Sequence, residues 1–199
     1  HPLSISTCED GAGALLARFE ALADSRERQL ALVELTPAGE RAWSFGELRQ
    51  AAAAHRLAAG GRLARLDGSG VELILQLLAA WRVGAVACAL DADEEIPDAA
   101  PPPGCVHLKR VLTSARQPCW AAFSAAQLQA DALRLVAAMG LRADMPGLAV
   151  LPLGQSFGFG SLVLPLLLHG IPLVVAPDGL PESMRAAFGW ARRRGVTLH

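Results

Sequence analysis

A glycine-rich turn in front of an apolar run is the first feature of this sequence that suggests phosphate chemistry. The turn reads Asp67-Gly68-Ser69-Gly70 and comes directly after Leu66. Backbone N–H groups at a helix N-terminus attract anions, and a turn of this kind can hold a pyrophosphate. The dinucleotide-binding fingerprint requires a third glycine, however, and Leu73 occupies its position. We therefore favour a tight turn into a capped helix. The alternative hypothesis, a dinucleotide-dependent oxidoreductase, is supported by this turn alone.

Metal sites and hydrolytic triads find little support. The sequence has four cysteines: Cys8, Cys88, Cys105 and Cys119. They form no C-x-x-C pair and have no histidine at ligand spacing, so no metal site is predicted, and we expect reduced thiols in a cytoplasmic protein. A Ser-His-Asp hydrolase is not expected either, because His55, His107 and His169 are isolated from one another. No residue is therefore predicted to be catalytic.

The composition excludes several classes of protein. The 199 residues carry a net charge of −1, and 52% are hydrophobic and 19% charged, which is typical of a chain with a packed core. A near-neutral chain without tyrosine lacks the basic surface and many of the aromatic platforms that nucleic-acid binding needs. The most apolar stretch, residues 161–177, contains three prolines and is shorter than the ~20 residues of a membrane-spanning helix. We expect neither a nucleic-acid partner nor a membrane span.

Helix and strand signals alternate along the chain. Capping boxes at Ser44, Ser69 and Ser124 predict helices that end near residues 59, 84 and 140. Two more helices are expected near residues 11–23 and 181–194. Strands are predicted for the short apolar runs, of which the first two flank a Pro-Gly turn and predict a β-hairpin. These runs are residues 30–35, 41–44, 62–66, 86–90, 106–112, 148–153 and 172–176.

This order predicts an α/β fold, with layered helix–sheet–helix packing and mostly parallel strands. The later strands are nearly all apolar, which suits a parallel sheet that is covered on both faces. One acidic, proline-rich stretch interrupts the alternation. We expect a surface connection at residues 96–105, between a first lobe at residues 1–95 and a second lobe at residues 106–199 that is incomplete at its C-terminal end.

Three segments have an order and spacing found in one enzyme family. The first is Ser44-Phe45-Gly46-Glu47-Leu48, ahead of an alanine-rich run. The second begins at Gly70-Val71-Glu72-Leu73 and continues to Asp91. The third is Leu151-Pro152-Leu153-Gly154-Gln155-Ser156-Phe157-Gly158-Phe159-Gly160. Over roughly residues 40–198 the sequence resembles the N-terminal part of the adenylate-forming superfamily, which comprises acyl-CoA and aryl-CoA synthetases and adenylation domains.

The resemblance implies a chemistry and a set of site residues. Members of this superfamily use ATP and Mg²⁺ to join a carboxylic acid to AMP with release of pyrophosphate, and then transfer the acyl group to a thiol. The resemblance places a nucleotide-binding loop on Thr113, Ser114, Arg116 and Pro118. It places an acyl pocket on Gln155, Ser156, Phe157, Gly158 and Phe159.

The matched loop departs from the family's pattern. It is shorter, lacks the family's glycines, and has Cys119 at the position of the family's lysine. The family's later motifs, which contact adenine, ribose and Mg²⁺, do not follow before His199. We therefore expect the N-terminal portion of an AMP-dependent acyl- or aryl-CoA synthetase-like protein that is inactive alone and does not bind ATP tightly. A fragment, a pseudoenzyme and a chain with a further part all fit this pattern.

A second hypothesis is a non-catalytic module that binds an acyl group or a partner protein. Residues 196–198 read like the start of a strand, and the apolar strands at residues 148–153 and 174–176 would then present an uncovered face or edge. Large exposed apolar patches are uncommon on monomers, and two-fold pairing is the commonest way to cover one. We expect either a homodimer or a C-terminal half that covers this face.

Overall fold

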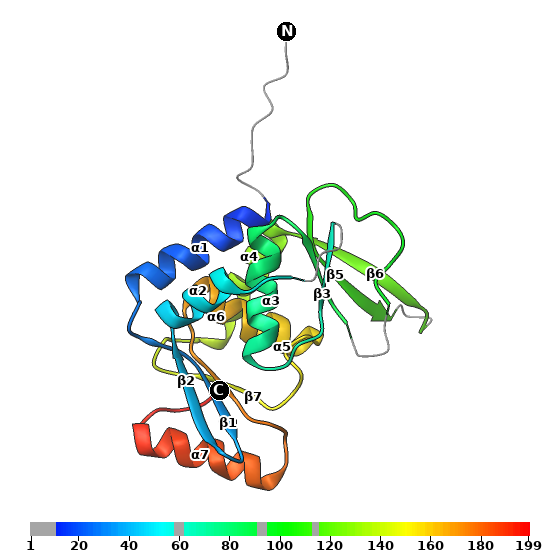
Figure 1. Ribbon diagram of the computed structural model, residues 1–199. Coiled ribbons are helices and arrows are strands. Elements are labelled where there is room, and N and C mark those ends of the chain that lie inside the picture. The colour runs from blue at the N-terminus through cyan, green and yellow to red at the C-terminus, as the bar shows by residue number, and fades with distance from the viewer. Residues whose placement is uncertain (1–10, 58–61, 91–94, 113–115) are drawn as a thin grey trace.

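The computed structural model describes residues 11–57, 62–90, 95–112 and 116–199 (Figure 1). Its helices are α1 (Ala12–Ser25), α2 (Phe45–Ala54), α3 (Val71–Arg82), α4 (Ala125–Met139), α5 (Ser156–Gly158), the π-helical turn η1 (Phe159–Val163), α6 (Leu164–His169) and α7 (Pro181–Arg194). Its strands are β1 (Leu30–Thr36), β2 (Gly39–Ser44), β3 (Leu63–Leu66), β4 (Val86–Ala89), β5 (Cys105–Leu112), β6 (Pro118–Ser124), β7 (Gly147–Ala149) and β8 (Leu173–Val175).

The strands of these residues form two four-stranded sheets. Sheet A has the order β2-β1-β8-β7, and sheet B has the order β3-β4-β5-β6. The pairs β1–β2 and β5–β6 are antiparallel, and the other neighbours are parallel. The predicted α/β fold with mostly parallel strands is confirmed.

A layer of helices lies between the two sheets and shares one core with both (Figure 1). α3 is at its centre, and most of its residues are buried apolar side chains, while Glu72 and Gln76 form a polar face. Leu32 and Leu173 from sheet A and Leu66 and Ala87 from sheet B all belong to this core. Because both sheets pack against the same helices, the helix layer determines how the sheets lie relative to each other.

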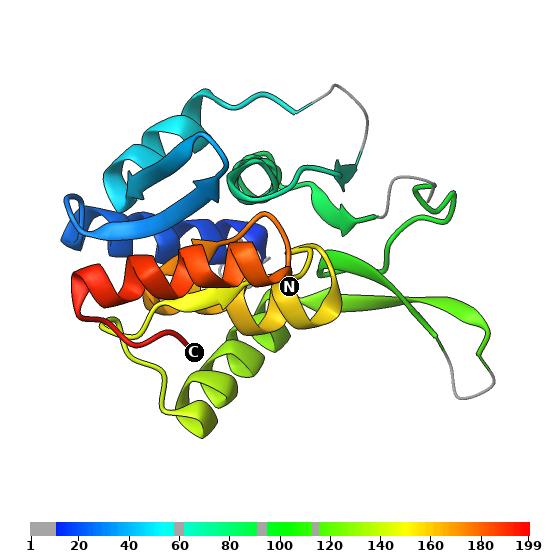
Figure 2. The same cartoon turned by 90° about the horizontal axis from the view of Figure 1, so that it is seen from below.

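α7 covers the other face of sheet A (Figure 2). Trp190 is fully buried in a cluster with Val33 and Val174, and Leu198 packs against the same cluster. The backbone N–H of Leu148 donates to the carbonyl of His199 (3.0 Å), so the end of the chain lies beside β7. Sheet A therefore does not present, within the described residues, the uncovered apolar face on which the homodimer was expected to form.

Two of the three predicted capping boxes are present. Ser44 and Ser124 each accept a hydrogen bond from the backbone three residues further on, and the side chain of that residue accepts one from the backbone of the cap. The predicted box at Ser69 is wrong, because Gly70 is the N-cap of α3 and has no side chain to cap it. α2 also ends at Ala54 rather than near residue 59, since the backbone is already extended at the next residue.

β6 is a strand that the local sequence signals did not predict. It pairs antiparallel with β5 from Cys105↔Ser124 to Leu112↔Pro118, and the hairpin extends away from the helix layer (Figure 2). β7 is conversely shorter than the predicted strand at residues 148–153. The chain turns there, and the N–H of Gln155 donates to the carbonyl of Pro152 (3.2 Å). Both differences concern backbone pairing that local apolarity does not reveal.

The acidic, proline-rich stretch connects two neighbouring strands of one sheet. Residues 95–104 lead from β4 to β5, which pair in parallel, and most of these residues are exposed. Ile96 packs against the outer face of sheet B in a cluster with Cys88 and Leu108. Sheet A combines strands from both sides of this stretch. The division into two lobes at residues 96–105 stays a prediction.

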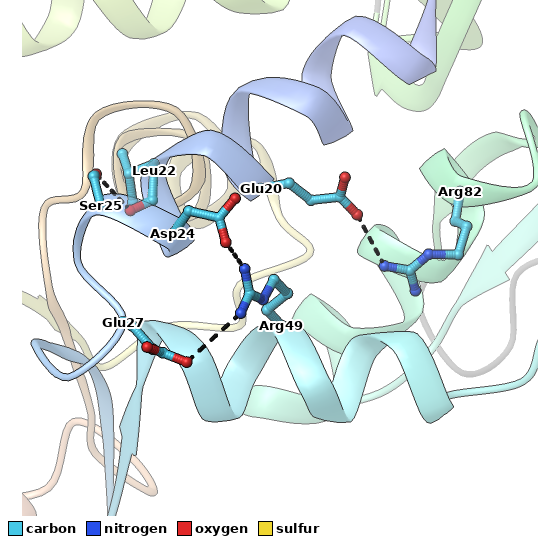
Figure 3. Close-up of polar contacts among 7 residues, drawn as sticks. All are labelled: Glu20, Leu22, Asp24, Ser25, Glu27, Arg49 and Arg82. Carbon is cyan, nitrogen blue, oxygen red and sulfur yellow. Dashed lines mark hydrogen bonds and ion pairs between the residues drawn. The ribbon is translucent and has the colours of Figure 1, made fainter.

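Ion pairs join α1, α2 and α3 at the surface of the helix layer (Figure 3). Arg49 of α2 pairs with Asp24 of α1 and lies 3.8 Å from Glu27, and Arg82 of α3 lies 3.4 Å from Glu20 of α1. All these side chains are partly exposed, and such pairs are worth little in water. The packing of these helices therefore rests on the apolar core beneath them.

Candidate functional site

A cleft of about 1320 Å³ lies where the parallel strands of both sheets end. Its walls include the carboxyl ends of β1, β3, β4, β5 and β8, together with residues 150–155 and 176–179. In sheets with parallel strands, ligands bind in the crevice outside the carboxyl ends of the strands. This cleft is therefore the candidate ligand site.

The carboxylate of Glu34 occupies the N-terminus of α3, in the wall of the cleft. Its Oε1 accepts a hydrogen bond from the backbone N–H of Val71 (2.9 Å). Gly70, the N-cap, has φ +58° and ψ −131°, and a Cβ built on it would lie 2.5 Å from the same oxygen. Glycine is thus required here by the backbone conformation and by the approach of Glu34.

The turn before α3 is closed by Gln76. Its side-chain oxygen accepts hydrogen bonds from the N–H groups of Asp67 and Gly68, both at 3.1 Å, and its side-chain nitrogen donates to Asp67 Oδ1 (3.1 Å). The N–H groups of Asp67, Gly68 and Val71, which could otherwise contact a pyrophosphate, are therefore bonded to the side chains of Gln76 and Glu34. This is the tight turn that the sequence favoured, and it gives the dinucleotide hypothesis no support.

The predicted acyl-pocket residues divide between the cleft and the core. Phe157 lines the cleft beside Gln155 and is 64% exposed. Phe159 is only 4% exposed and stacks on His107, with ring centroids 4.1 Å apart and an interplanar angle of 7°. Of the two rings that were expected to border a cleft, Phe157 does so and Phe159 does not. The acyl-binding role of the segment stays a prediction.

This segment begins a helix that the sequence did not predict to start there. α5 begins at Ser156 and leads through η1 into α6, and the N–H of Leu164 donates to the carbonyl of Phe159, five residues earlier. Pro165 lacks the N–H that a regular α-helix would direct to the carbonyl of Ser161, and the wider π turn lies directly before it. At the other end, Gly158 packs so closely that a Cβ would lie 2.6 Å from the carbonyl oxygen of Pro152.

The predicted nucleotide loop is described only in part. Thr113 and Ser114 lie outside the described residues. Arg116 is exposed and has φ +58°, and Pro118 is the first residue of β6, paired with Leu112. Pro118 therefore belongs to a strand of the hairpin, and the nucleotide-binding role of these four residues stays a prediction.

His107 is fully buried beneath the cleft, at 1% exposure. Neither ring nitrogen has a hydrogen-bond partner among the described residues. Burial lowers the pKa of His107 to about 3, and the charge of Lys109 on the same strand contributes to this lowering. The ring is therefore neutral at pH 7, and it serves as an aromatic support for Phe159 rather than as a base.

Residues 154–158 have the G-x-S-x-G spacing of a nucleophile elbow, with Ser156 at its centre, so this spacing does not by itself exclude a hydrolase. Such an elbow places its serine on a sharp turn between a strand and a helix. Here β7 ends at Ala149, and Ser156 is the first residue of α5. His107 lies beside this segment, but no carboxylate of the described residues orients its ring as a triad requires.

Neither a metal cluster nor a membrane span is found within the described residues. No group of three His, Cys, Asp or Glu side chains there is placed to hold a metal ion. No helix of the described chain is long and apolar enough to cross a bilayer.

Comparison with known proteins shows the fold. The N-terminal domain of FACL13 from Mycobacterium tuberculosis has 15% identity and a TM-score of 0.67, over 92% of this chain and 61% of that chain. O-succinylbenzoate coenzyme A synthetase from Bacillus subtilis, solved with ATP and magnesium, has 16% identity and a TM-score of 0.67, over 91% and 62%. A fatty acyl-adenylate ligase from L. pneumophila, solved with acyl adenylate and pyrophosphate, has 14% identity and a TM-score of 0.66, over 94% and 42%.

The similarity is confined to structure and to part of each neighbour. The chain spans between 42% and 62% of the length of these solved structures. No protein-family model matches the sequence, and no curated protein matches it at a significant level. The described fold is therefore that of the N-terminal part of acyl-CoA synthetases and acyl-adenylate ligases.

Replacing Gly70 by alanine tests the contact between Glu34 and α3. We expect Gly70→Ala to lower the free energy of unfolding by about 2 kcal/mol or more, because the Cβ is strained and displaces the Glu34 carboxylate. Gly84 is the control, since it also has a positive φ (+69°) but no atom within 4 Å of the position that a Cβ would take. Urea unfolding should show a smaller loss for Gly84→Ala, of about 1–2 kcal/mol. Additive losses for Gly70→Ala and Glu34→Ala in the double variant would contradict the contact.

The free energy of unfolding should decrease as the pH falls, because of His107. Its folded pKa lies below the unfolded value of about 6.5, so the unfolded chain binds a proton first as the pH falls. Stability from the neutral ring is fully present above pH ~6.5 and is lost towards pH ~3, by at most about 1.4 kcal/mol per pH unit. His107→Phe keeps a ring against Phe159 and removes this part of the slope. Identical slopes in urea unfolding of the two proteins between pH 7 and 4 would contradict the prediction.

Proposed function

We propose that this chain is the N-terminal portion of an acyl- or aryl-CoA synthetase-like protein of the adenylate-forming superfamily. In the parent reaction a carboxylate attacks the α-phosphate of ATP, pyrophosphate leaves, and the acyl group passes from AMP to a thiol. The observation that carries the proposal is the large cleft at the carboxyl ends of the strands of both sheets. The shared fold with acyl-CoA synthetases and acyl-adenylate ligases supports it.

Within this proposal the chain supplies the acid-binding half of the site. Leu151 and Phe157 are exposed apolar side chains in the cleft wall, and such side chains suit the apolar part of a carboxylic acid. The nucleotide half has less support, because Glu34 and Gln76 already bond the N–H groups at the start of α3. The described residues also hold no carboxylate cluster that fits Mg²⁺. We therefore propose no step through a metal ion and no adenylation by this chain alone.

A second candidate function is a non-catalytic acyl-binding or protein-interaction module. The occupied N-terminus of α3 favours it, since a pseudoenzyme keeps the acid cleft without a nucleotide cradle. In both cases we propose that the remaining contacts come from a C-terminal half or a partner, such as a second copy. We also propose a cytoplasmic location, which the free cysteines Cys88, Cys105 and Cys119 support.

Phe157 tests the acid-binding cleft. We expect the acyl-adenylate analogue octanoyl sulfamoyl adenosine to bind the chain, and Phe157→Ala to weaken binding about tenfold in calorimetry, because an apolar wall is lost. Phe188→Ala is the matched control, since this phenylalanine is 54% exposed on α7 and outside the cleft wall. The synthetase proposal expects the analogue to bind more tightly than octanoate. Equal affinities favour the acyl-binding module, and equal effects of the two variants would contradict the site.

ATP should bind weakly to the chain. A charge-assisted hydrogen bond contributes roughly 1.5–3 kcal/mol, and the matched loop has neither the family's lysine nor its glycines. We expect a dissociation constant no better than about millimolar. Calorimetry with ATP and Mg²⁺ measures it, and micromolar binding by the unmodified chain would overturn this prediction.

A further inference from the structure

We propose that Lys109 is the anion-binding residue of the cleft and that its ammonium group receives the carboxylate of an acid with an apolar tail. The inference rests on the proposed function and deepens it, because it names the group that holds the acid. Neither the glycine-rich turn nor the loop at residues 113–118 contains this residue.

Lys109 is the sole lysine in the sequence, in which the other basic residues counted with it are arginines. It lies near the carboxyl end of β5 and lines the cleft. Its Nζ is buried and has no hydrogen-bond partner among the described residues. An ammonium without a partner is costly to bury, and a ligand carboxylate would relieve that cost.

The acidic side chains of the cleft wall are already engaged elsewhere. Glu34 accepts from the N–H of Val71, Asp67 pairs with Arg65 (3.1 Å), and Asp178 accepts from the N–H of Leu180 (3.0 Å). None of these three carboxylates bonds to Lys109. A ligand anion therefore meets a cation that the cleft's own acids leave unpaired.

The surroundings of Lys109 suit an apolar tail. Lys109 pairs with Ala89 across the sheet, so both side chains lie on the inner face of sheet B. A Cβ built on Gly154 would lie 3.5 Å from Ala89 Cβ and 3.1 Å from Leu73 Cδ1, which places the start of the 154–160 segment over this face. Gly154 thus packs directly on this face, and a carboxylate at Lys109 would have its tail in the cleft, whose wall also contains Leu151 and Phe157.

The charge and the position of the Lys109 ammonium group are consistent with binding of an anion. Burial lowers the pKa of Lys109, because an ammonium group without a partner is costly away from water, and the neighbouring His107 is neutral and adds no charge of its own. The Nζ is buried although Lys109 lines the cleft, and the proposal requires that rotation about the torsions of this long side chain brings the Nζ into the cleft. Binding of a carboxylate should then raise the pKa of Lys109, because an opposite charge favours the ammonium form.

The sole lysine gives a direct spectroscopic test. Reductive methylation with carbon-13 formaldehyde labels Lys109 and the amino terminus, and the Lys109 signal is the one missing from Lys109→Met. We expect octanoate to shift this signal and to raise the pKa that it reports. We expect Lys109→Met to weaken octanoate binding about tenfold or more in calorimetry, and Lys109→Arg to retain most of it. Octanol, which has the same tail without the charge, should bind the unmodified chain and Lys109→Met alike.

Arg134→Met is the control, because this exposed arginine on α4 is outside the cleft wall and should leave octanoate binding unchanged. Thermal unfolding checks that Lys109→Met folds; if it does not, the titration of the labelled, unsubstituted chain decides. Equal octanoate affinity in Lys109→Met, or no shift of the Lys109 signal, overturns the proposal. A shift with AMP or inorganic phosphate but not with octanoate overturns the carboxylate assignment in favour of a phosphate.

The result is separable from the test of the proposed function. Octanoate is used here without nucleotide, so an acid that binds at Lys109 supports the inference even if the acyl-adenylate analogue binds no more tightly than the acid. The opposite pattern, with tight binding of the analogue and no effect of Lys109→Met, retains the synthetase proposal and removes Lys109 from it.

Discussion

The hydrogen bond from the N–H of Val71 to Glu34 joins the two halves of this structure at the point where they form the cleft. Most of α3 is buried, and the first N–H groups of a helix have no partner within the helix. Glu34 lies on β1 of sheet A, while α3 leads out of sheet B, so one carboxylate satisfies the helix and connects both sheets. Position 70 favours glycine because its backbone conformation is strained for other residues, and because a Cβ there would displace the Glu34 carboxylate from this contact.

The same contact shapes what the cleft can bind. An α3 N-terminus without a partner would attract phosphate groups, but here the position is filled by a side chain of the protein. The unpaired cation of the cleft, within the part of the chain that the structure describes, lies instead at Lys109 of β5. We therefore propose that this part of the chain holds an organic acid rather than a nucleotide, a proposal that agrees with a loop that lacks the glycines of the family it resembles.

The two phenylalanines of the segment that follows β7 have different surroundings. Phe159 points into the core and stacks on the buried His107, whereas Phe157 remains in the cleft wall. The helix that carries both rings contains the π turn that precedes Pro165. Gly158 in this helix packs closely against Pro152. A substitution at Phe159 would thus disturb the core, while one at Phe157 would change the ligand surface.

The sequence by itself determined the features that depend on neighbouring residues. The capping boxes at Ser44 and Ser124, the hairpin of β1 and β2 and the bounds of α7 all follow from signals within a few residues, and all are present. The sequence also predicted the α/β class, since alternating helix and strand signals are additive along the chain. The place of the 154–160 segment near a cleft came from resemblance, and only Phe157 of its two rings is in the wall.

Tertiary structure alone decided the contacts between distant residues. Glu34 caps a helix that begins 37 residues further on, and no local pattern announces such a partner. β6 is a strand because β5 supplies its hydrogen bonds, although Pro118 and the polar residues before it read as a loop. In the sequence Lys109 is a single cation in an apolar run, and only the sheet register places it beside Ala89 and in the cleft wall. Burial and pairing of this kind depend on the whole fold, because they are set by which surfaces exclude water together.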